Sequence, residues 1–527
     1  MSGAGRSVAI PGNSGADALA RTLIANDVTV CFTNPGTSEM HFVGALDRVR
    51  GLRCILGLFE GVVTGAADGY ARIADKPAVT LLHLAPGLAN GAANLHNARK
   101  AHSPIVNIVG EHATYHRELE SPLAGDVAGV ARPFSHWIHM PNAGDDIARA
   151  GAMAIAEARR RPGRIATLIL PADLSWSEGG PVAMSPPVPL QSRPDQHAIR
   201  LAAAALRCGR RSMLMLGGRA TRGEVLTLAG RIAAKTDCRL LTESNNPVLQ
   251  RGAGRTPLQR LPSTPVEAAQ STLADVDDLV LAGAKPPVAF FAYPGRPSFL
   301  TPEGCRSLVV ASPEDDVEHA LRALAEELDA DGCEPIAASY DPPDIPRGAF
   351  SYDGIGAVIG ALLPENAIVV DESVTTGRRF PVHTANAAPH DWLNSMGGSI
   401  GFALPNALGA AVAAPDRKVI ALEGDGSGMY TLQALWSMAR EGSDVTILVF
   451  ANRTYEILIG EFQRMGSGDI GPRARDMLEI SRPTIDWLAL AKGHGVEAGE
   501  ANDLEELAVQ FRRGLACKGP YLIQVNL

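Results

Sequence analysis

One stretch near the carboxyl end of the chain, residues 417–458, most strongly limits the fold that this sequence can adopt. An apolar run over 419–422 predicts a buried strand, and it stops at the glycine-rich segment 424–428, Gly-Asp-Gly-Ser-Gly. A helical pattern follows, with apolar residues at three- and four-residue spacing: Leu432, Leu435, Trp436 and Ala439. Gly442 ends this helix, and a second apolar run over 445–450 leads to Asn452. The stretch therefore predicts a strand–turn–helix–strand unit of the kind that builds α/β folds.

Two oxygen-bearing side chains follow the strands of this unit. Asp425 and Asn452 each come just after a predicted strand, and we expect these two strands to be neighbours. Open α/β sheets bind ligands at the edge formed by the carboxyl ends of their strands. Glycines let a ligand approach the backbone, and the free N–H groups at a helix start attract anions. A carboxylate and an amide oxygen suit Mg²⁺, which shares its oxygen ligands with phosphates. We therefore expect a diphosphate bridged to the protein by Mg²⁺, although a Gly-Asp-Gly triplet standing alone is as often a plain turn.

Length and charge narrow the functional classes. The 527 residues suggest about three domains, and the net charge of −9 argues against nucleic acid or an anionic membrane as a partner. The seven cysteines are scattered without a C-x-x-C pair, which fits a reducing compartment and neither a disulfide framework nor a zinc site. The N-terminus shows no secretory signal, and no apolar run is long enough to span a membrane. We therefore expect a cytoplasmic protein.

Strand and helix patterns alternate along most of the chain. In the first segment, 1–180, helical patterns separate apolar runs that predict strands at 28–32, 54–59, 79–84, 105–109 and 166–170. A second series covers 198–330, and a third, 350–527, contains the glycine-rich unit. Pro-rich stretches at 177–197 and 331–349 predict linkers. We therefore predict three consecutive doubly wound parallel-sheet domains.

Glu60 is a second candidate for chemistry. It follows the apolar stretch 55–59 and precedes Gly-Val-Val, so its carboxyl group lies among apolar neighbours. Because burial disfavours the charged form of a carboxyl group, such a residue can hold or share a proton near neutral pH. The alternative is an ordinary glutamate in the first turn of a helix, where the helix dipole favours it. Position alone favours this second interpretation.

Several motifs resemble a known superfamily. The motifs are NPG-x-x-E from Asn34, LFEGVVTGAADGYAR over 58–72, GFALP from Gly401, GDGS-x-x-Y from Gly424 and N-x-T-Y from Asn452. They resemble the thiamine diphosphate (ThDP)-dependent 2-oxo acid decarboxylase and acetohydroxyacid synthase superfamily, most closely benzoylformate decarboxylase. The resemblance covers nearly the whole chain. It implies a pyrimidine-binding domain (1–180), a middle Rossmann-like domain (198–330) and a diphosphate-binding domain (350–527).

The resemblance also implies roles for individual residues. Asp425, Asn452 and the Thr454 carbonyl would hold Mg²⁺, and Glu60 would contact a pyrimidine ring nitrogen of ThDP. Ile400 would wedge the cofactor into a bent shape. The implied cofactor-binding residues are Asn34, Pro35, Gly36, Glu60, Val374, Thr375, Thr376, Gly398, Ile400, Gly424, Gly426, Ser427, Tyr430 and Tyr455.

Histidines and hydroxyl groups are the implied proton-handling residues. His83 matches the pyrimidine-domain histidine of benzoylformate decarboxylase, and Thr37 occupies the position of its substrate-contacting serine. The stretch that matches its middle-domain histidine, residues 288–294, contains no histidine. This departure argues against benzoylformate decarboxylation itself. His112 and His116 follow a predicted strand and are candidate replacements, although a surface-loop interpretation of the two is favoured.

The resemblance implies a ThDP- and Mg²⁺-dependent enzyme that acts on 2-oxo acids by non-oxidative decarboxylation, carboligation or both, through an enamine intermediate. One alternative is an acetolactate synthase-like carboligase. FAD in the middle domain would favour that branch, but no firm FAD motif is present, and Gly217-Gly218 reads more simply as a tight turn. Another alternative is a ThDP-binding paralogue without catalytic activity. A nicotinamide dehydrogenase is disfavoured because no G-x-G-x-x-G fingerprint is present.

Assembly and a covering segment are also expected. In the superfamily, the residue that matches Glu60 faces the glycine-rich unit of a neighbouring subunit, which implies a homodimer or homotetramer. Residues 459–482 are rich in polar and helix-breaking residues and are expected to cover the active site, because such lids exclude water from reactive intermediates.

Overall fold

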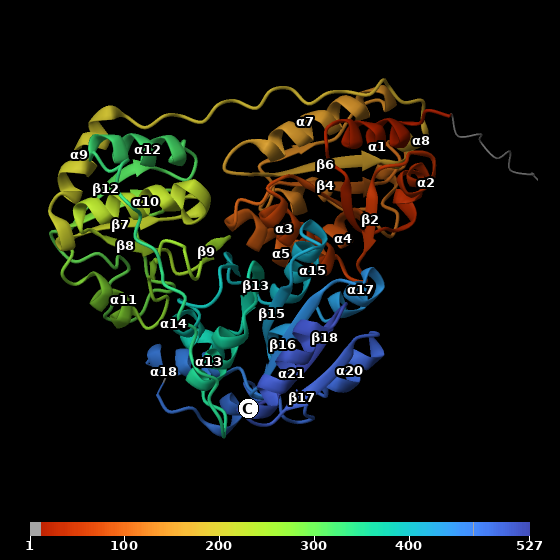
Figure 1. Cartoon of the computed structure of the whole chain (residues 1–527). Coiled ribbons are helices and arrows are strands. Elements are labelled where there is room, and N and C mark those ends of the chain that lie inside the picture. Colours follow the sequence, from red (N-terminus) through yellow and green to blue (C-terminus); the bar gives the residue numbers. More distant parts are fainter. Residues whose placement is uncertain (1–11, 467) are drawn as a thin grey trace, which may run out of the picture. The chain divides into compact units, whose positions relative to one another are not determined.

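The computed structural model describes residues 12–466 and 468–527, and in these residues the strands form three sheets (Figure 1). The chain divides into two compact units. The first unit contains the chain up to Pro189 together with Leu408–Ala413, and the second contains Leu190–Ala407 and Ala414–Leu527. The first sheet lies in the first unit, and the other two lie in the second unit. The three-sheet α/β class predicted from the sequence is confirmed.

A six-stranded parallel sheet with the order β2-β1-β3-β4-β6-β5 forms the first unit. Its strands are β1 (Val30–Asn34), β2 (Arg53–Leu56), β3 (Ala78–Leu82), β4 (Ile105–Glu111), β5 (Trp137–His139) and β6 (Ile165–Pro171). Its helices are α1 (Gly15–Ala25), α2 (Met40–Arg48), α3 (Glu60–Ala74), α4 (Leu84–Asn90), α5 (Ala92–Lys100), α6 (Val127–Ala131), α7 (Ile147–Arg159) and α8 (Ala172–Trp176). Helices α1 and α7 cover one face of the sheet, and α3 and α5 cover the other (Figure 1).

The second sheet is parallel and has the order β10-β8-β7-β11-β12. Its strands are β7 (Ser212–Leu216), β8 (Arg239–Thr242), β10 (Gln259–Arg260), β11 (Asp278–Ala282) and β12 (Arg306–Ala311). Its helices are α9 (Gln196–Leu206), α10 (Gly223–Thr236), α11 (Val266–Leu273) and α12 (Val317–Glu327). One apolar core joins α9, α10 and α12 to the sheet, and a second core includes α11. Helices on both faces hide the strands from water, which explains their nearly continuous apolar sequences.

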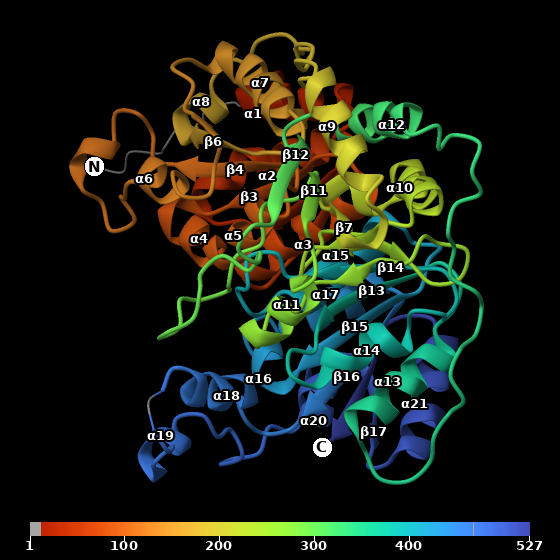
Figure 2. The same ribbon diagram turned by 90° about the vertical axis from the view of Figure 1, so that its left-hand side faces the viewer.

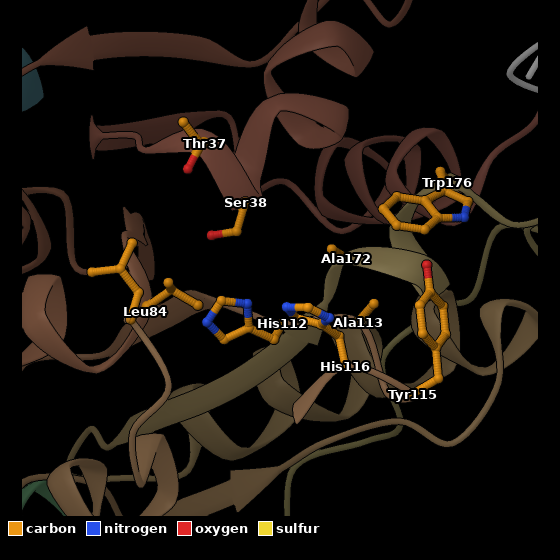
Figure 3. Close-up of a pocket in the computed structure, with 10 residues that line it drawn as sticks. Thr37, Ser38, Leu84, His112, Ala113, Tyr115, His116, Ala172 and Trp176 are labelled. Atoms are coloured by element: carbon orange, nitrogen blue, oxygen red, sulfur yellow. The ribbon is translucent and has the colours of Figure 1, made fainter. Parts of the chain in front are cut away.

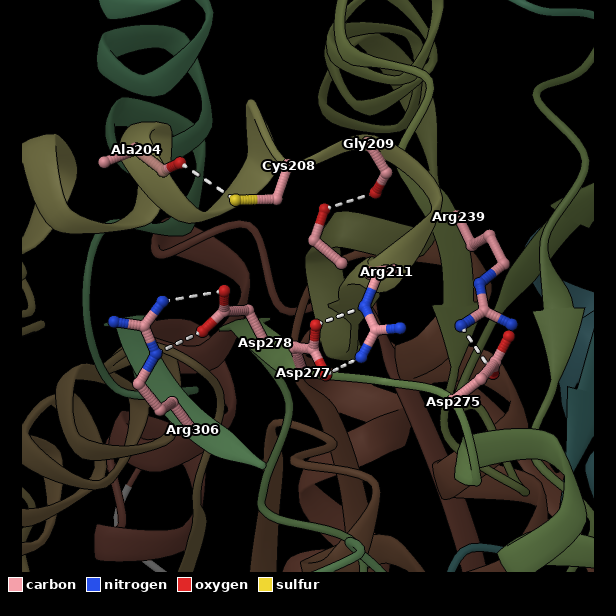
Figure 4. A network of polar contacts seen from close by, with 10 residues as sticks. Ala204, Cys208, Gly209, Arg211, Arg239, Asp275, Asp277, Asp278 and Arg306 are labelled. Carbon is pink, nitrogen blue, oxygen red and sulfur yellow. Dashed lines mark hydrogen bonds and ion pairs between the residues drawn. The ribbon is translucent and has the colours of Figure 1, made fainter. Parts of the chain in front are cut away.

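Three arginine–aspartate pairs lie beside this second sheet, around the start of β11 (Figure 4). Arg306 donates two hydrogen bonds to Asp278, of 2.6 and 2.8 Å. Arg239 donates one of 2.9 Å to Asp275, and Arg211 donates from Nε and Nη2 to the two carboxylate oxygens of Asp277. The Arg211 and Arg306 side chains are largely exposed, and that of Arg239 is partly exposed. Ion pairs that are open to solvent add little stability, so we assign these three pairs to the surface and not to a site.

The third sheet has the order β17-β18-β16-β15-β13-β14-β9, and its pairs are parallel except β14–β9. Its strands are β9 (Leu249–Arg251), β13 (Ala367–Glu372), β14 (His390–Asn394), β15 (Val419–Gly424), β16 (Val445–Ala451), β17 (Glu497–Ala501) and β18 (Tyr521–Asn526). Its helices are α13 (Tyr352–Leu362), α14 (Phe380–His383), α15 (Ala403–Ala413), α16 (Asp425–Gly428), α17 (Ala434–Glu441), α18 (Glu456–Arg464), α19 (Pro472–Asp476), α20 (Trp487–Gly493) and α21 (Leu504–Ala516). Figure 2 shows α13, α14 and α21 together on one side of this sheet.

The local predictions are mostly confirmed, and the differences lie mainly at the ends of elements. Strand β2 ends at Leu56 and not at Phe59, because Phe59 instead precedes the first turn of α3. The glycine-rich segment after β15 is not an open turn, since residues 425–428 form the short helix α16. Residues 331–349 contain no helix or strand, as expected, whereas the predicted linker 177–197 ends earlier than expected because α9 begins at Gln196. The domain boundaries drawn from them stay predictions.

Two other expectations concern membranes and the ends of the chain. Within the described residues, no helix is long and apolar enough to cross a membrane. The expected absence of a secretory signal concerns the first residues, and 1–11 lie outside the described residues. All seven cysteines are described, and each is a free thiol.

Candidate active site

The loop after β1 folds back on itself around a buried glutamate. The Gly36 N–H donates a 2.8 Å hydrogen bond to Glu39 Oε2, and the Ser38 hydroxyl donates one of 2.6 Å to Glu39 Oε1. His83, which follows β3, has its Nδ1 2.8 Å from Glu39 Oε2 and 3.2 Å from Ser38 Oγ. A buried carboxylate on one ring nitrogen fixes the orientation of an imidazole. Neighbouring strands thus bring the predicted His83 to the NPG-x-x-E loop, and Glu39 is its partner.

We predict that Gly36→Ala disables His83 without unfolding the protein. A Cβ atom at residue 36 would overlap the His83 ring, so the ring would have to leave Glu39. Because small displacements of catalytic groups are costly, turnover should fall by about 100-fold. Gly44→Ala in α2 is a suitable control, since its new Cβ would come no closer than 3.4 Å to the end of the flexible Arg48 side chain. Activity assays and melting curves of both variants test this, and unchanged turnover in Gly36→Ala would contradict it.

Glu60 begins α3 and is 8% exposed. The Asn90 side chain donates a 3.0 Å hydrogen bond to its Oε2. A Cβ atom on Gly87 would lie 3.1 Å from Glu60 Oε1 and 3.3 Å from His83 Cβ, so both residues lie against the same point of α4. Glu60 is therefore buried, as its apolar neighbours in the sequence predicted. It is also the first residue of a helix, as the alternative interpretation predicted.

Three residues with a left-handed backbone fall on the predicted cofactor segments. Leu84 follows His83 with φ +52°, Val374 has φ +49°, and Arg453 has φ +59° between Asn452 and Thr454. Side chains rarely adopt this conformation, and for a β-branched residue such as valine it is costly. Strain of this kind concentrates at functional sites, where the surrounding structure enforces it. Of the described non-glycine residues with a positive φ, Leu84 and Val374 are the apolar ones, and both lie in or beside segments that the sequence predicted for the site.

The predicted metal ligands lie on neighbouring strands, as expected. Strands β15 and β16 pair directly, and Asp425 and Asn452 follow their carboxyl ends. Asp425 Oδ2 accepts a 2.7 Å hydrogen bond from the Arg453 N–H, and Asn452 Oδ1 accepts one of 3.1 Å from the Thr454 N–H. Burial raises the pKa of Asp425 to about 6. A divalent cation would offset this cost of ionising Asp425, and the oxygen-only donor set is the one that Mg²⁺ prefers.

A second buried carboxyl group was missed by the sequence analysis. Glu423 faces Glu372 across the β13–β15 pair, and Glu372 Oε2 accepts hydrogen bonds of 2.6 and 3.0 Å from the N–H groups of Phe402 and Ala403. Burial raises the pKa of Glu372 to about 7 and that of Glu423 well above its usual range, to which the nearby Glu372 charge also contributes. Both shifts favour the protonated forms of these two carboxyl groups. The sequence indicates Glu423 only by its position, since it is a glutamate directly after the apolar run 419–422.

The remaining predicted residues of the second unit line the same edge of the third sheet. Among the described residues, the buried Thr375 hydroxyl has no hydrogen-bond partner, which suits a residue that meets a phosphate oxygen. A Cβ atom on Gly426 would lie 2.5 Å from the Tyr455 ring, so only glycine fits there.

The other predicted residues lie in the neighbouring loops. Gly424 precedes α16, Ser427 lies in it, and Val374 and Thr376 flank Thr375. In the loop that precedes α15, Gly398 is exposed and Ile400 is half-buried. Tyr430 packs near Gly401.

A cavity of about 300 Å³ opens in the first unit beside the NPG-x-x-E loop (Figure 3). Its polar lining consists of Thr37, Ser38, His112, Tyr115 and His116. Its apolar lining includes Leu84, Leu123 and Trp176. The His112 and His116 rings come from the loop after β4 and lie 5.7 Å apart. Both histidines thus line a cavity with Thr37, whereas the sequence favoured a surface loop without function.

The stretch that lacks the middle-domain histidine carries exposed aromatic rings instead. Phe290 and Phe291 are about half exposed and pack edge to face, with centroids 4.8 Å apart. The Phe290 ring lies 3.1 Å from the position of a Cβ atom on Gly398. Tyr293 donates a 3.0 Å hydrogen bond to Glu461 of α18, within the segment 459–482 predicted as a cover. Residue 467 of that segment lies outside the described residues, and its covering role stays a prediction.

Comparison with known proteins identifies the family to which the two groups of candidate residues belong. Residues 13–137 match the thiamine pyrophosphate enzyme N-terminal TPP binding domain, and residues 377–525 match the C-terminal TPP binding domain. A Mycobacterium tuberculosis protein provisionally named acetolactate synthase large subunit IlvX is 50% identical over 97% of this chain and 98% of its own. Benzoylformate decarboxylase of Pseudomonas aeruginosa is 30% identical over 94% of this chain and 96% of its own.

Solved structures give the same result. The ThDP-dependent 4-hydroxybenzoylformate decarboxylase of Rhodococcus jostii superposes with a TM-score of 0.83 at 25% identity, over 97% of this chain and 99% of its own. Benzoylformate decarboxylase of Polynucleobacter necessarius, at 21% identity and a TM-score of 0.81 over 98% of both chains, shares the fold. The chain therefore belongs to the thiamine diphosphate-dependent enzymes, in the family that contains the decarboxylases and the acetolactate synthases.

Proposed function

We propose that this protein is a ThDP- and Mg²⁺-dependent enzyme that removes CO₂ from 2-oxo acids and releases an aldehyde, or joins the remaining carbon to a second carbonyl compound. The observation that carries the proposal is the intact pair of half-sites. Glu60, His83 and Glu39 are held together at the carboxyl end of the first sheet, and Asp425 and Asn452 lie at the carboxyl end of the third. A protein that had lost its chemistry would have no reason to keep the buried Glu60 or the strained loops.

The chain's own residues have separable tasks in this proposal. Asp425, Asn452 and the Thr454 carbonyl would hold Mg²⁺, and Thr375 with the backbone near Gly426 would bind the diphosphate. Glu60 would hold a proton at the pyrimidine ring, supported by Asn90. Bound ThDP supplies a carbon nucleophile and a sink for the electrons that CO₂ leaves behind. His83, oriented by Glu39, would move a proton at the substrate oxygen.

We also propose that the active unit is at least a homodimer, with Glu60 of one copy serving the glycine-rich unit of another. Met429 and Tyr430, which directly follow α16, are 37% and 53% exposed. Exposed apolar residues beside a buried charged site are typical of a surface that a partner covers. Light scattering with and without ThDP tests the proposal, and a fully active monomer would refute it.

A panel of 2-oxo acids provides the direct test of the reaction. CO₂ release from pyruvate, branched-chain, dicarboxylic and aromatic 2-oxo acids should depend on both ThDP and Mg²⁺ and should stop with EDTA. Release without added cofactor from dialysed protein, or none from any acid while ThDP is shown to be bound, would overturn the proposal. The exposed Phe290 and Phe291 favour acids with large side groups.

A second candidate is an acetolactate synthase-like carboligase, favoured by the 50% identical relative. The products distinguish the two candidates. Pyruvate would give acetolactate with a carboligase and acetaldehyde with a decarboxylase. A mass spectrum of the products from one reaction decides between them.

A further inference from the structure

Two cysteines of the first unit lie opposite each other in neighbouring strands. Cys31 in β1 and Cys54 in β2 are register partners in the parallel β1–β2 pair. Side chains of directly paired residues point to the same face of a sheet, and both of these side chains pack in the apolar core that contains α1 and α7. Of the seven cysteines, these are the two that are paired across strands in the described part of the chain.

The spacing of the two strands suits a disulfide bond. Neighbouring strands lie about 4.7–4.9 Å apart, and a disulfide joins Cα atoms that are about 4.4–6.8 Å apart. The two thiols already form a hydrogen bond with each other. Backbone hydrogen bonds on either side hold this register, 2.8 Å from the Arg53 N–H to the Thr29 carbonyl and 2.9 Å from the Gly57 N–H to the Thr33 carbonyl.

The two thiols differ in access and in acidity. Cys31 is fully buried, whereas Cys54 is partly exposed on the edge strand β2. Their mutual hydrogen bond lowers the pKa of Cys54 and, together with burial, raises the pKa of Cys31 well above its usual range. Because the thiolate is the reactive form of cysteine, Cys54 is the thiol that reacts first with an oxidant. An accessible cysteine of low pKa beside a second, resolving cysteine is typical of redox-sensing sites.

Both strands lead into loops that carry candidate catalytic residues. Asn34 of the NPG-x-x-E loop ends β1, and Glu60 begins α3 shortly after β2. A disulfide brings its two Cβ atoms to about 3.8 Å, which is about 1 Å less than the spacing of paired strands. Within the described residues β2 pairs with β1 alone, so β2 is the strand that would move. A displacement of about 1 Å in a catalytic group can lower turnover about 100-fold.

We propose that Cys31 and Cys54 are a reversible oxidation site, at which a peroxide joins the two strands by a disulfide bond and so displaces Glu60. The effect of this displacement on turnover rests on the proposed function, whereas the disulfide itself does not.

The chemistry of the site is balanced with hydrogen peroxide as the oxidant. The Cys54 thiolate attacks one peroxide oxygen, the O–O bond breaks, and the departing hydroxide takes up the proton that Cys54 had lost. The Cys31 sulfur then attacks the sulfur of the resulting sulfenic acid, the S–O bond breaks, and water leaves with the Cys31 proton. Two thiols are oxidised to one disulfide, and the peroxide is reduced to two molecules of water. A thiol reductant reverses the change by exchange.

Peptide mass spectrometry of the full chain with bound ThDP and Mg²⁺ tests the site. After treatment with hydrogen peroxide, blocking of free thiols and digestion with trypsin, the peptides 22–48 and 54–72 should be joined by a disulfide. Arginines separate the two cysteines, so trypsin releases them in different peptides. Dithiothreitol added before the blocking step should remove the link. Cys54→Ser should form no link, and Cys208→Ser, which changes an exposed cysteine, is the matched control and should respond as wild type.

Two further measurements report the displacement of Glu60. Turnover should fall by about 100-fold on oxidation and recover with dithiothreitol, whereas Cys54→Ser should stay active in peroxide. Hydrogen exchange of the backbone around Glu60 should increase in the oxidised protein, and this measurement needs no substrate.

The outcomes separate this proposal from the proposed function. The joined peptides, together with a reversible loss of turnover and faster exchange around Glu60, support it. Unlinked peptides under conditions that oxidise Cys208 refute the site, and a complete link with unchanged turnover and exchange refutes the displacement. If the wild-type protein releases no CO₂ from any 2-oxo acid, the proposed function fails, whereas the peptide masses and hydrogen exchange still decide this proposal.

Discussion

Glu60→Gln should reduce turnover by about 100- to 10 000-fold, the range that a positioned acid–base group contributes. Glutamine keeps the size of the side chain and can still accept the Asn90 hydrogen bond. It cannot hold or release a proton at the pyrimidine ring, so the loss should appear in kcat. ThDP affinity and the melting temperature should change little, because Glu60 has no ion pair in the described structure that the substitution would break.

The control for this experiment is Glu157→Gln in α7. Glu157 pairs with Arg160 and Arg164 at the surface of the same unit, far along the chain from the predicted cofactor residues. Steady-state rates and calorimetric ThDP binding should be measured for both variants. Undiminished turnover of Glu60→Gln would remove the assigned role, and a large drop in its melting temperature would show that Glu60 is structural.

Asp425→Asn should abolish the Mg²⁺-dependent part of ThDP binding. Asparagine retains one of the two oxygens that accept from Gly426 and Arg453, but it places an N–H₂ group against an N–H donor and removes the charge that attracts the cation. We expect the Kd for ThDP in the presence of Mg²⁺ to rise by about 100-fold or more, which corresponds to about 3 kcal/mol.

Calorimetric titrations with and without EDTA test this second expectation. For the wild-type protein, EDTA should weaken ThDP binding strongly, and for Asp425→Asn it should make little further difference. Asp416→Asn, an exposed aspartate in the loop before the same strand, is the control and should behave as wild type. Equal responses to EDTA in Asp425→Asn and the wild-type protein would show that Asp425 holds no metal.

Much of the fold follows from local periodicity. The apolar runs at 419–422 and 445–450 are strands because both of their faces are buried, and such runs are visible in the sequence. Gly442 ends α17 in a left-handed conformation, φ +60°, as a glycine after a helical pattern predicts. Asp425 and Asn452 were expected to be neighbours because parallel strands end at the same edge, and the direct pairing of β15 with β16 confirms it.

The contacts that orient the candidate catalytic side chains could not be predicted from local periodicity. In the sequence Glu39 is only the last residue of the NPG-x-x-E motif, and its contact with His83 depends on β1 lying beside β3 in the sheet. The raised pKa of Glu423 depends on its burial and on β13, which places Glu372 directly opposite to it. His112 and His116 read as surface residues because nothing in the linear sequence around them shows a cavity, whereas folding places Thr37 and Trp176 across from them.

The sequence by itself thus determined the α/β class, the glycine-rich unit and the candidates Glu60, His83, Asp425 and Asn452. The class, the glycine-rich unit and the pair Asp425 and Asn452 depend on repeat spacing and on residues close together in the chain, whereas Glu60 and His83 were assigned through the resemblance of their motifs. Only the tertiary structure decided which side chains share a site: Glu39 with His83, Glu372 with Glu423, and His112 with His116 and Thr37. Sheet order and register set those pairings, and both are fixed by burial of the whole apolar surface and not by any local stretch.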